Sequence, residues 1–148
     1  MLQKSTCQEL AYMLILKRIF MSLTFSVYHG EVFQIEAILL KNGEAPAEEW
    51  LNSLTQKQQQ KFAALFALLA DGGKIWNERK FKHLEGTDQI FEFKVDEVRI
   101  LCFFFIGKRI ILTHGFTKHS SKTPLREIER AQKYKSDFIM RTKNEKSK

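Results

Sequence analysis

The sequence has little of what marks membrane proteins, secreted proteins and disulfide-stabilised domains. Its two cysteines, Cys7 and Cys102, lie far apart, so we expect no structural disulfide and a reducing, cytoplasmic environment. The apolar run near the amino end covers residues 11–16, far fewer than the roughly 20 residues that a membrane span needs. The run is followed by Lys17 and Arg18 and lacks the small-residue cleavage site of a signal peptide. The sequence therefore predicts no membrane partner.

Residue groups that hold metals or perform the common forms of covalent catalysis are also missing. There is no glycine-rich phosphate-binding loop, no nucleophile elbow, and no second cysteine close to either cysteine. Glu92 and Asp96 have no evident carboxylate mate, which argues against glycosidase-like acid and base chemistry. We predict no metal and no cofactor, because zinc-ligand spacing is absent among the four histidines, which are His29, His83, His114 and His119.

Positive charge is concentrated in the second half of the chain. The formal net charge is +7, and residues 1–73 hold 6 Lys or Arg and 7 Asp or Glu, whereas residues 74–148 hold 18 and 10. Clustered Lys and Arg gain free energy from counterion release on a phosphate backbone. The asymmetry indicates a nucleic acid or another acidic partner for the second half.

The apolar residues of the second half predict the centre of a sheet. Residues 98–106 are almost unbroken Val, Ile, Leu and Phe, which is typical of a strand buried on both faces. The next apolar run, 110–116, follows Gly107 and Lys108, and Gly at the first of two loop positions favours a type II′ hairpin. With 13 Phe in 148 residues, the chain can bury a sizeable core as one domain.

The predicted turn sets the register of this hairpin. Counting outwards from Ile106 opposite Arg109 gives three further pairs, namely Phe103 with Leu112, Leu101 with His114, and Arg99 with Phe116. Paired residues project to the same face of a sheet. One face should therefore be apolar near the turn and basic and aromatic at the far end. The apolar residues are Phe103, Phe105, Ile110 and Leu112, and those at the far end are Arg99, His114 and Phe116.

The run before this hairpin, residues 90–94, can join it through a tight turn at Asp96 and Glu97. That turn places Lys94 opposite Arg99, on the same face. A slip of one residue would instead send Lys94 to the other face of the sheet.

Turn and capping signals divide the rest of the chain. Residues 22–40 alternate apolar and polar side chains, which predicts one or two strands broken at Gly30. Pro46 begins a helix, and a capping box that starts at Thr55 begins a second helix, which ends at Gly73.

These elements predict the α+β class, with N-terminal helices packed on a small antiparallel-rich sheet and a C-terminal helix after Pro124. Residues 21–141 are expected to form a single domain. Residues 1–20 are expected to be an extension outside the fold, with translation starting at Met21, or alternatively a short amphipathic helix. Residues 142–148 are expected to be a disordered basic tail.

The groups left for chemistry are Lys, Arg and His. Lys94, Arg99, His114 and Lys118 converge if the predicted register holds, and the segment 74–85 adds basic residues just before the sheet. Cationic and imidazole groups can supply the base, the acid and the charge that are needed when a ribose 2′-hydroxyl attacks the neighbouring phosphate. The pattern favours RNA cleavage without a metal, against the simpler interpretation of each Lys or Arg as a solvated strand end.

Four separated motifs occur in the order and spacing of one family. They are NGEAPAEEWLNSL at 42–54, FKHLEG at 81–86, the strands FEFK and VRILCFFF within 91–105, and HGFTKHSSKTPLREIERA at 114–131. Over about residues 31–141 the chain resembles the phage-derived Gp49-like branch of the RelE/HigB toxin superfamily. The resemblance implies a type II toxin of small α+β fold, an endoribonuclease that enters the ribosomal A site and cuts mRNA. It also implies a helix-turn-helix antitoxin as partner.

The same resemblance implies roles for individual residues. Lys82 and Arg99 stand where the family has basic residues, and we expect them to stabilise the phosphorane. Lys118 is expected to bind phosphate, and His114 or His83 to move the proton. Phe116 is expected to stack on a base. The residues expected to contact RNA are Lys80, His83, Lys94, Phe116, His119 and Lys122.

Other interpretations stay open. His114 can instead be a structural histidine, hydrogen-bonded at a strand end. Lys94 stands where the family usually has Arg, and Val98 where it usually has an aromatic residue. Because Lys cannot make the bidentate phosphate contact of Arg, slower cleavage or a non-toxic relative is an alternative. The same fold can also serve as a non-catalytic module for nucleic acid or antitoxin, or act on DNA gyrase as the ParE relatives do.

Overall fold

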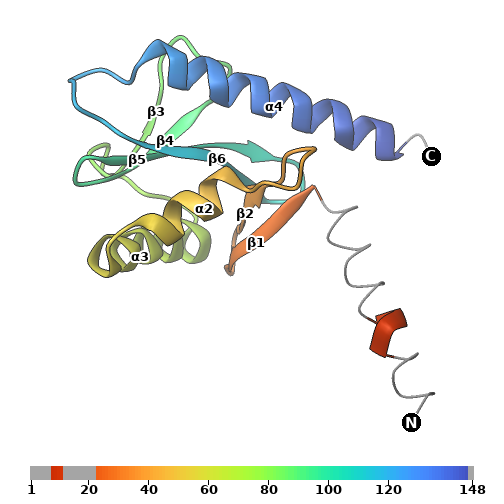
Figure 1. Ribbon diagram of the computed structural model, residues 1–148. Helices are drawn as coiled ribbons and strands as arrows, with labels where there is room; N and C mark the ends of the chain where they lie inside the picture. Colours follow the sequence, from red (N-terminus) through yellow and green to blue (C-terminus); the bar gives the residue numbers. More distant parts are fainter. Residues whose placement is uncertain (1–7, 12–22, 147–148) are drawn as a thin grey trace.

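The computed structural model describes residues 8–11 and 23–146. Residues 23–146 form an α+β fold with a six-stranded sheet (Figure 1). Most of the predicted extension, residues 1–20, and the predicted start at Met21 lie outside the described residues. In chain order the elements are β1 (Thr24–His29), β2 (Gln34–Ile38), α2 (Pro46–Ser53), α3 (Gln56–Gly72), β3 (Phe81–His83), β4 (Phe91–Val95), β5 (Val98–Phe105), β6 (Arg109–Thr117) and α4 (Leu125–Lys146).

The strands form one mixed sheet in the order β1-β2-β6-β5-β4-β3. All neighbours are antiparallel except β2 and β6, which run parallel. The predicted α+β class and C-terminal helix are therefore confirmed. The prediction that the two helices are N-terminal to the sheet is not confirmed, because α2 and α3 follow β1 and β2, the strands predicted within residues 22–40. A parallel pair needs a long crossover connection, and these helices lie within the crossover from β2 to β6.

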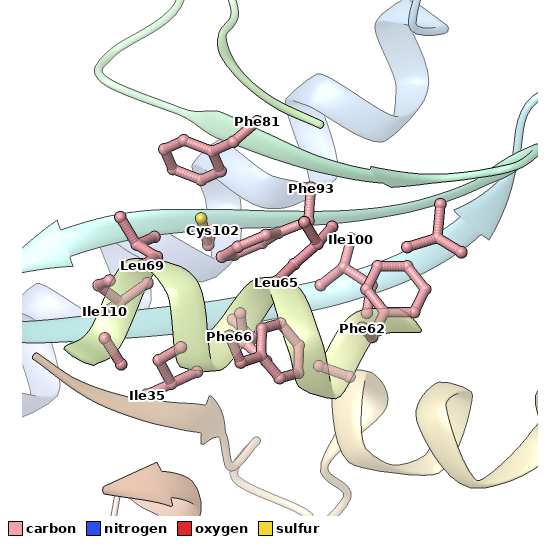
Figure 2. Packing of buried hydrophobic residues seen from close by; sticks show 14 of the residues in the cluster. Ile35, Phe62, Leu65, Phe66, Leu69, Phe81, Phe93, Ile100, Cys102 and Ile110 are labelled. Carbon is pink, nitrogen blue, oxygen red and sulfur yellow. The ribbon is translucent and has the colours of Figure 1, made fainter. Parts of the chain in front are cut away.

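Helices cover the two faces of the sheet (Figure 1). α3 packs on one face, where side chains from the helix meet side chains from the strands in a single buried cluster (Figure 2). Its largest members include Phe62, Phe66, Phe93, Ile100 and Ile110. Burying each such side chain stabilises the fold by roughly 1.5–3 kcal/mol. α4 crosses the opposite face, where Ala131 and Phe138 pack on Leu101, Phe103 and Ile111. The prediction that the strand beginning at Val98 is buried on both faces is confirmed.

The helix boundaries follow the predicted signals. Pro46 is the first residue of α2. Thr55 and Gln58 form both hydrogen bonds of a capping box before α3, and Gly73 ends that helix with a φ of 81°. α4, in contrast, continues through Lys146, so residues 142–146 are helical where a disordered tail was predicted. None of the helices in the described part of the chain is long and apolar enough to cross a membrane.

The β5–β6 hairpin has a longer turn than predicted. Residues 106–108 form the loop, Gly107 and Lys108 both have positive φ, and Phe105 pairs with Arg109. The strands near the turn are therefore shifted by one residue, which sends Ile110 and Leu112 to the α3 face instead of the predicted face.

An irregularity in the same hairpin reverses this shift. The register changes between Leu101 and Cys102, where Thr113 is the additional residue on β6 and donates its hydroxyl hydrogen to the Leu101 carbonyl at 3.1 Å. Beyond it, Leu101 pairs with His114 as predicted, and the strand ends regain the predicted register. The bulge thus restores the far end of the hairpin, where the basic residues lie.

Two smaller features complete that end of the sheet. Val95 pairs with Val98 across a two-residue turn, as predicted, and Asp96 in this turn has a φ of 52°. The basic segment 74–85 contains the short strand β3, which pairs antiparallel with β4 and forms one edge of the sheet.

Candidate functional site

Strand pairing brings the predicted basic residues to one face. Lys82 on β3 pairs with Glu92 on β4, and Lys94 on β4 pairs with Arg99 on β5. Glu92 and Lys94 are two residues apart on one strand, so all four side chains project to the same face. Arg99 in turn pairs with Phe116, a member of the cluster under α4. The face is therefore the α4 face, and the alternative in which Lys94 points the other way is wrong.

Backbone hydrogen bonds hold the ends of these strands together. The Lys118 N–H donates to the Glu97 carbonyl at 2.7 Å, which ties the end of β6 to the β4–β5 turn. The Lys94 N–H donates to the Lys80 carbonyl at 2.9 Å, which continues the β3–β4 pairing beyond the strand. Residues far apart in sequence thus meet at one end of the sheet. We call Lys82, Lys94, Arg99 and Lys118 the cationic cluster.

The electrostatics of Lys94 show how close these charges are. Burial is the main cause that lowers the pKa of Lys94, and the negative charge of Glu92 opposes the shift. The other three members of the cationic cluster lower this pKa further, namely Lys82, Lys118 and Arg99. Because salt screens exposed charges beyond about 8–10 Å, this mutual effect agrees with the strand pairing that brings the four cations to one end of the sheet.

Glu92 lies beneath the cationic cluster and is 1 % exposed. Thr123, in the loop before α4, donates its hydroxyl hydrogen to Glu92 Oε1 at 2.7 Å. The same oxygen lies 3.8 Å from Nε of Arg99, within ion-pair distance. Sequence reasoning treated Glu92 only as a carboxylate without a mate. Strand alternation could have identified it, because a residue two positions before Lys94 must share its face.

The Arg99 side chain is held against the β4–β5 turn. Its Nη1 donates to the carbonyls of Asp96 and Val98 at 2.8 and 3.0 Å. Its Nε has no hydrogen-bond partner among the described residues. The two hydrogen bonds hold the guanidinium in one orientation, and a positive charge fixed in this way is suited to stabilising an oxyanion.

The structure does not bring His114 to the surface of the cationic cluster. The His114 side chain is 1 % exposed, and its Nε2 lies 3.5 Å from Glu127 without a hydrogen bond. Burial, with a contribution from Arg130, lowers the pKa of His114 to about 4, so the ring is neutral at physiological pH. Thr113 Oγ1 lies 3.2 Å from Nδ1, and because its hydrogen goes to Leu101, this oxygen accepts from Nδ1–H. The geometry fits the alternative of a structural histidine.

The remaining predicted residues are distributed over both faces. Phe116 is 8 % exposed in the core beneath α4, which leaves its ring closed to a stacked base. His83 alternates with Lys82 on β3 and faces the α3 side, with its ring centroid 5.1 Å from that of Phe91. The other three residues predicted to contact RNA are exposed on the segments that flank the cationic cluster. They are Lys80, His119 and Lys122.

The site therefore consists of four cations over a buried carboxylate, at a partly open end of the sheet. Lys82 is exposed, while Lys94, Arg99 and Lys118 are half-buried. Such a site can bind a phosphate group and stabilise additional negative charge on it. Within residues 8–11 and 23–146, no three His, Cys, Asp or Glu side chains are grouped so as to hold a metal ion.

Comparison with known proteins identifies a family. The family model described as phage-derived protein Gp49-like matches residues 49–136, more than half of the chain. The match extends from α2 into α4 and contains every member of the cationic cluster. No curated protein gives a significant match to the chain.

Proposed function

This chain belongs to the phage-derived Gp49-like family, a RelE/HigB-like toxin family, and we propose that it is the toxin of a type II toxin-antitoxin pair that cleaves mRNA on the ribosome. An antitoxin partner follows from the family, and we propose that it carries a helix-turn-helix domain. The ribosome and mRNA are the proposed targets.

The cationic cluster is the observation that carries this proposal. In the proposed reaction the ribose 2′-hydroxyl loses its proton to a base and the 2′-oxygen forms a bond to the adjacent phosphorus. The bond from phosphorus to the 5′-oxygen breaks, and the 5′-oxygen takes up a proton from water, so that a 2′,3′-cyclic phosphate and a 5′-hydroxyl result. The phosphorane carries more negative charge than the ground state, so preorganised cations accelerate the step. Arg99 and Lys82 are proposed to bind the non-bridging oxygens, and Lys118 the neighbouring phosphate.

A base must also accept the 2′-hydroxyl proton. We assign this role to Lys94 in place of His114, because His114 is buried beneath α4. Burial and three neighbouring cations lower the pKa of Lys94, so it loses its proton more easily than an ordinary Lys. A Lys at this position, where the family usually has Arg, then has a chemical use that an Arg could not provide.

Induced expression tests the proposal. Wild-type protein should arrest growth and produce message fragments with 5′-hydroxyl ends, which primer extension and end-labelling detect. Arg99→Ala should lower the cleavage rate by about 10²–10³-fold, the usual effect of removing one preorganised charge donor. Arg126→Ala, which removes an exposed Arg of α4, is the matched control and should cleave like wild type.

A second variant separates catalysis from folding. Arg99 also donates hydrogen bonds to the turn, so Lys82→Ala, which changes an exposed side chain, should lower cleavage while leaving the thermal unfolding midpoint unchanged. Full cleavage by both variants would refute the proposed site. Arrest without any message cleavage, abolished by Arg99→Ala, would favour a non-catalytic module or a gyrase-directed toxin.

A further inference from the structure

A cleft of about 450 Å³ lies at the β3 edge of the sheet, on the α3 face. This volume is within the ~300–1,000 Å³ range of small-ligand sites. Phenylalanine rings line it: Phe81 and Phe91 are stacked, with centroids 5.4 Å apart and planes 8° apart, and Phe104 meets Phe91 edge-on at 5.0 Å. We call this site the edge cleft. Its wall is a π-surface, and Phe104 remains 36 % exposed.

Trp76 stands at the mouth of the edge cleft and is 80 % exposed. The Lys74 ammonium lies 3.5 Å from the centroid of its ring, a cation–π contact that orients the indole. An exposed Trp held in one orientation is a platform on which a planar group can stack. The cation beside it favours a ligand that is negatively charged near the stacked group.

Polar groups of the edge cleft lack partners. His83 lines the cleft, and its Nε2 is buried without a hydrogen-bond partner among the described residues, so a polar group of a ligand could pair with it. The backbone of β3 adds more. The Leu84 N–H donates to the Ile90 carbonyl, and the Lys80 carbonyl accepts from the Lys94 N–H. Because alternate residues of an edge strand bond to its neighbour, the backbone N–H and carbonyl of His83 face the free edge of the sheet.

Lys82 connects the edge cleft with the cationic cluster. Lys82 lies on the edge strand β3 and is among the residues that line the cleft, and its charge also acts on Lys94 of the neighbouring strand β4. A chain of phosphates along the cationic cluster therefore passes next to an aromatic cleft. The lining of the edge cleft contains two lysines, Lys74 and Lys82, and one acidic residue, Glu78. Its net positive charge therefore suits a polyanion better than a peptide without acidic residues.

We propose that the edge cleft binds an unpaired nucleobase of the RNA whose backbone lies at the cationic cluster, with the base stacked on Trp76. The inference rests on the proposed function, and it adds a base-contacting site to the phosphate site. Stacking on aromatic rings accepts any base, and hydrogen bonds at His83 and the β3 edge provide a preference among bases.

Fluorescence anisotropy with the full-length protein tests the proposal. The probe is a single-stranded 2′-O-methyl oligonucleotide of about eight nucleotides, which lacks the attacking hydroxyl and falls in the ~4–16-nucleotide range of single-strand sites. Trp76→Ala should weaken binding by about 5- to 100-fold, the effect of losing one base–aromatic stack. Trp76→Phe should retain most of the affinity. Phe25→Ala, which removes a half-exposed aromatic ring from β1 at the opposite edge of the sheet, should bind like wild type.

The outcomes distinguish this inference from the proposed function. A loss with Trp76→Ala that disappears for an abasic probe supports the edge cleft. Unchanged binding by Trp76→Ala, with a loss in Lys82→Ala and Arg99→Ala, overturns the edge cleft and leaves the phosphate site standing. Unchanged binding by all three variants overturns both. A Trp76→Ala variant that keeps RNA affinity and loses antitoxin affinity also overturns it, and assigns the cleft to the protein partner.

Discussion

Replacing the buried carboxylate under the cationic cluster is the perturbation with the largest expected effect on stability. Glu92→Gln removes a negative charge and keeps the size of the side chain. The amide oxygen of Gln can still accept the hydrogen bond from Thr123, so the change tests the charge rather than the hydrogen bond.

The distance to Arg99 sets the magnitude. At an effective dielectric constant of about 20, opposite charges 3.8 Å apart attract by about 4 kcal/mol. Removing one partner of a buried pair commonly destabilises a protein by about 3–5 kcal/mol, because the remaining charge has no compensation. Since Lys82, Lys94 and Lys118 also lose their counter-charge but reach water, we expect the free energy of unfolding to fall by about 2–4 kcal/mol. Urea denaturation followed by Trp fluorescence measures this change.

Phosphate provides a second and more specific assay. Without Glu92 the cationic cluster has four positive charges and no buried counter-charge, so a phosphate ion should bind it more tightly and stabilise the folded state by mass action. Replacing chloride with phosphate at equal ionic strength should raise the unfolding midpoint of Glu92→Gln more than that of wild type. Glu129→Gln, on the exposed side of α4, is the control and should follow wild type in both salts.

Two results would refute this reasoning. A Glu92→Gln protein within about 0.5 kcal/mol of wild type, the range of ordinary surface substitutions, would show that Glu92 does not compensate the cations. Equal stabilisation of Glu92→Gln and wild type by phosphate would show that the cationic cluster is not an anion site.

Two further predictions concern the β6 strand. In Gly115→Ala the new Cβ would lie 1.9 Å from Trp50 Cδ1, so we expect a loss of about 1–3 kcal/mol or more in urea denaturation; Gly72→Ala, where a Cβ meets no atom within 4 Å, should be neutral or stabilising. His114 has a pKa of about 4 in the folded state and 6.5 as the reference value, so its contribution to stability is complete above pH 6.5 and is lost as the pH falls towards 4. The stability of wild type should therefore fall by about 3 kcal/mol more than that of His114→Gln over this range, and parallel pH profiles of the two proteins would contradict the burial of a neutral ring.

Local signals were sufficient for much of the fold. The capping box at Thr55 and the left-handed Gly73 involve residues within one turn of each other, so the bounds of α3 follow from a few neighbouring residues. The two-residue turn at Asp96 likewise sets the pairing of Lys94 with Arg99 by counting. Two members of the cationic cluster were predicted to meet for this reason.

Long-range packing decided what these signals could not. β3 has three residues and no periodicity of its own, so only its pairing with β4 identifies it as a strand and places Lys82 opposite Glu92. The bulge at Thr113 depends on how the hairpin fits between two helical layers. Counting residue pairs outwards from the turn therefore cannot predict it.

The sequence by itself determined the α+β class, the Gp49-like family, the helix boundaries at Thr55 and Gly73, and the presence of a basic second half. These properties depend on composition and on neighbouring residues. Only the tertiary structure decided that Glu92 lies under the cations and that His114 and Phe116 are covered by α4. Burial is a property of the elements that pack above a residue, and α4 begins only after the strands that it covers.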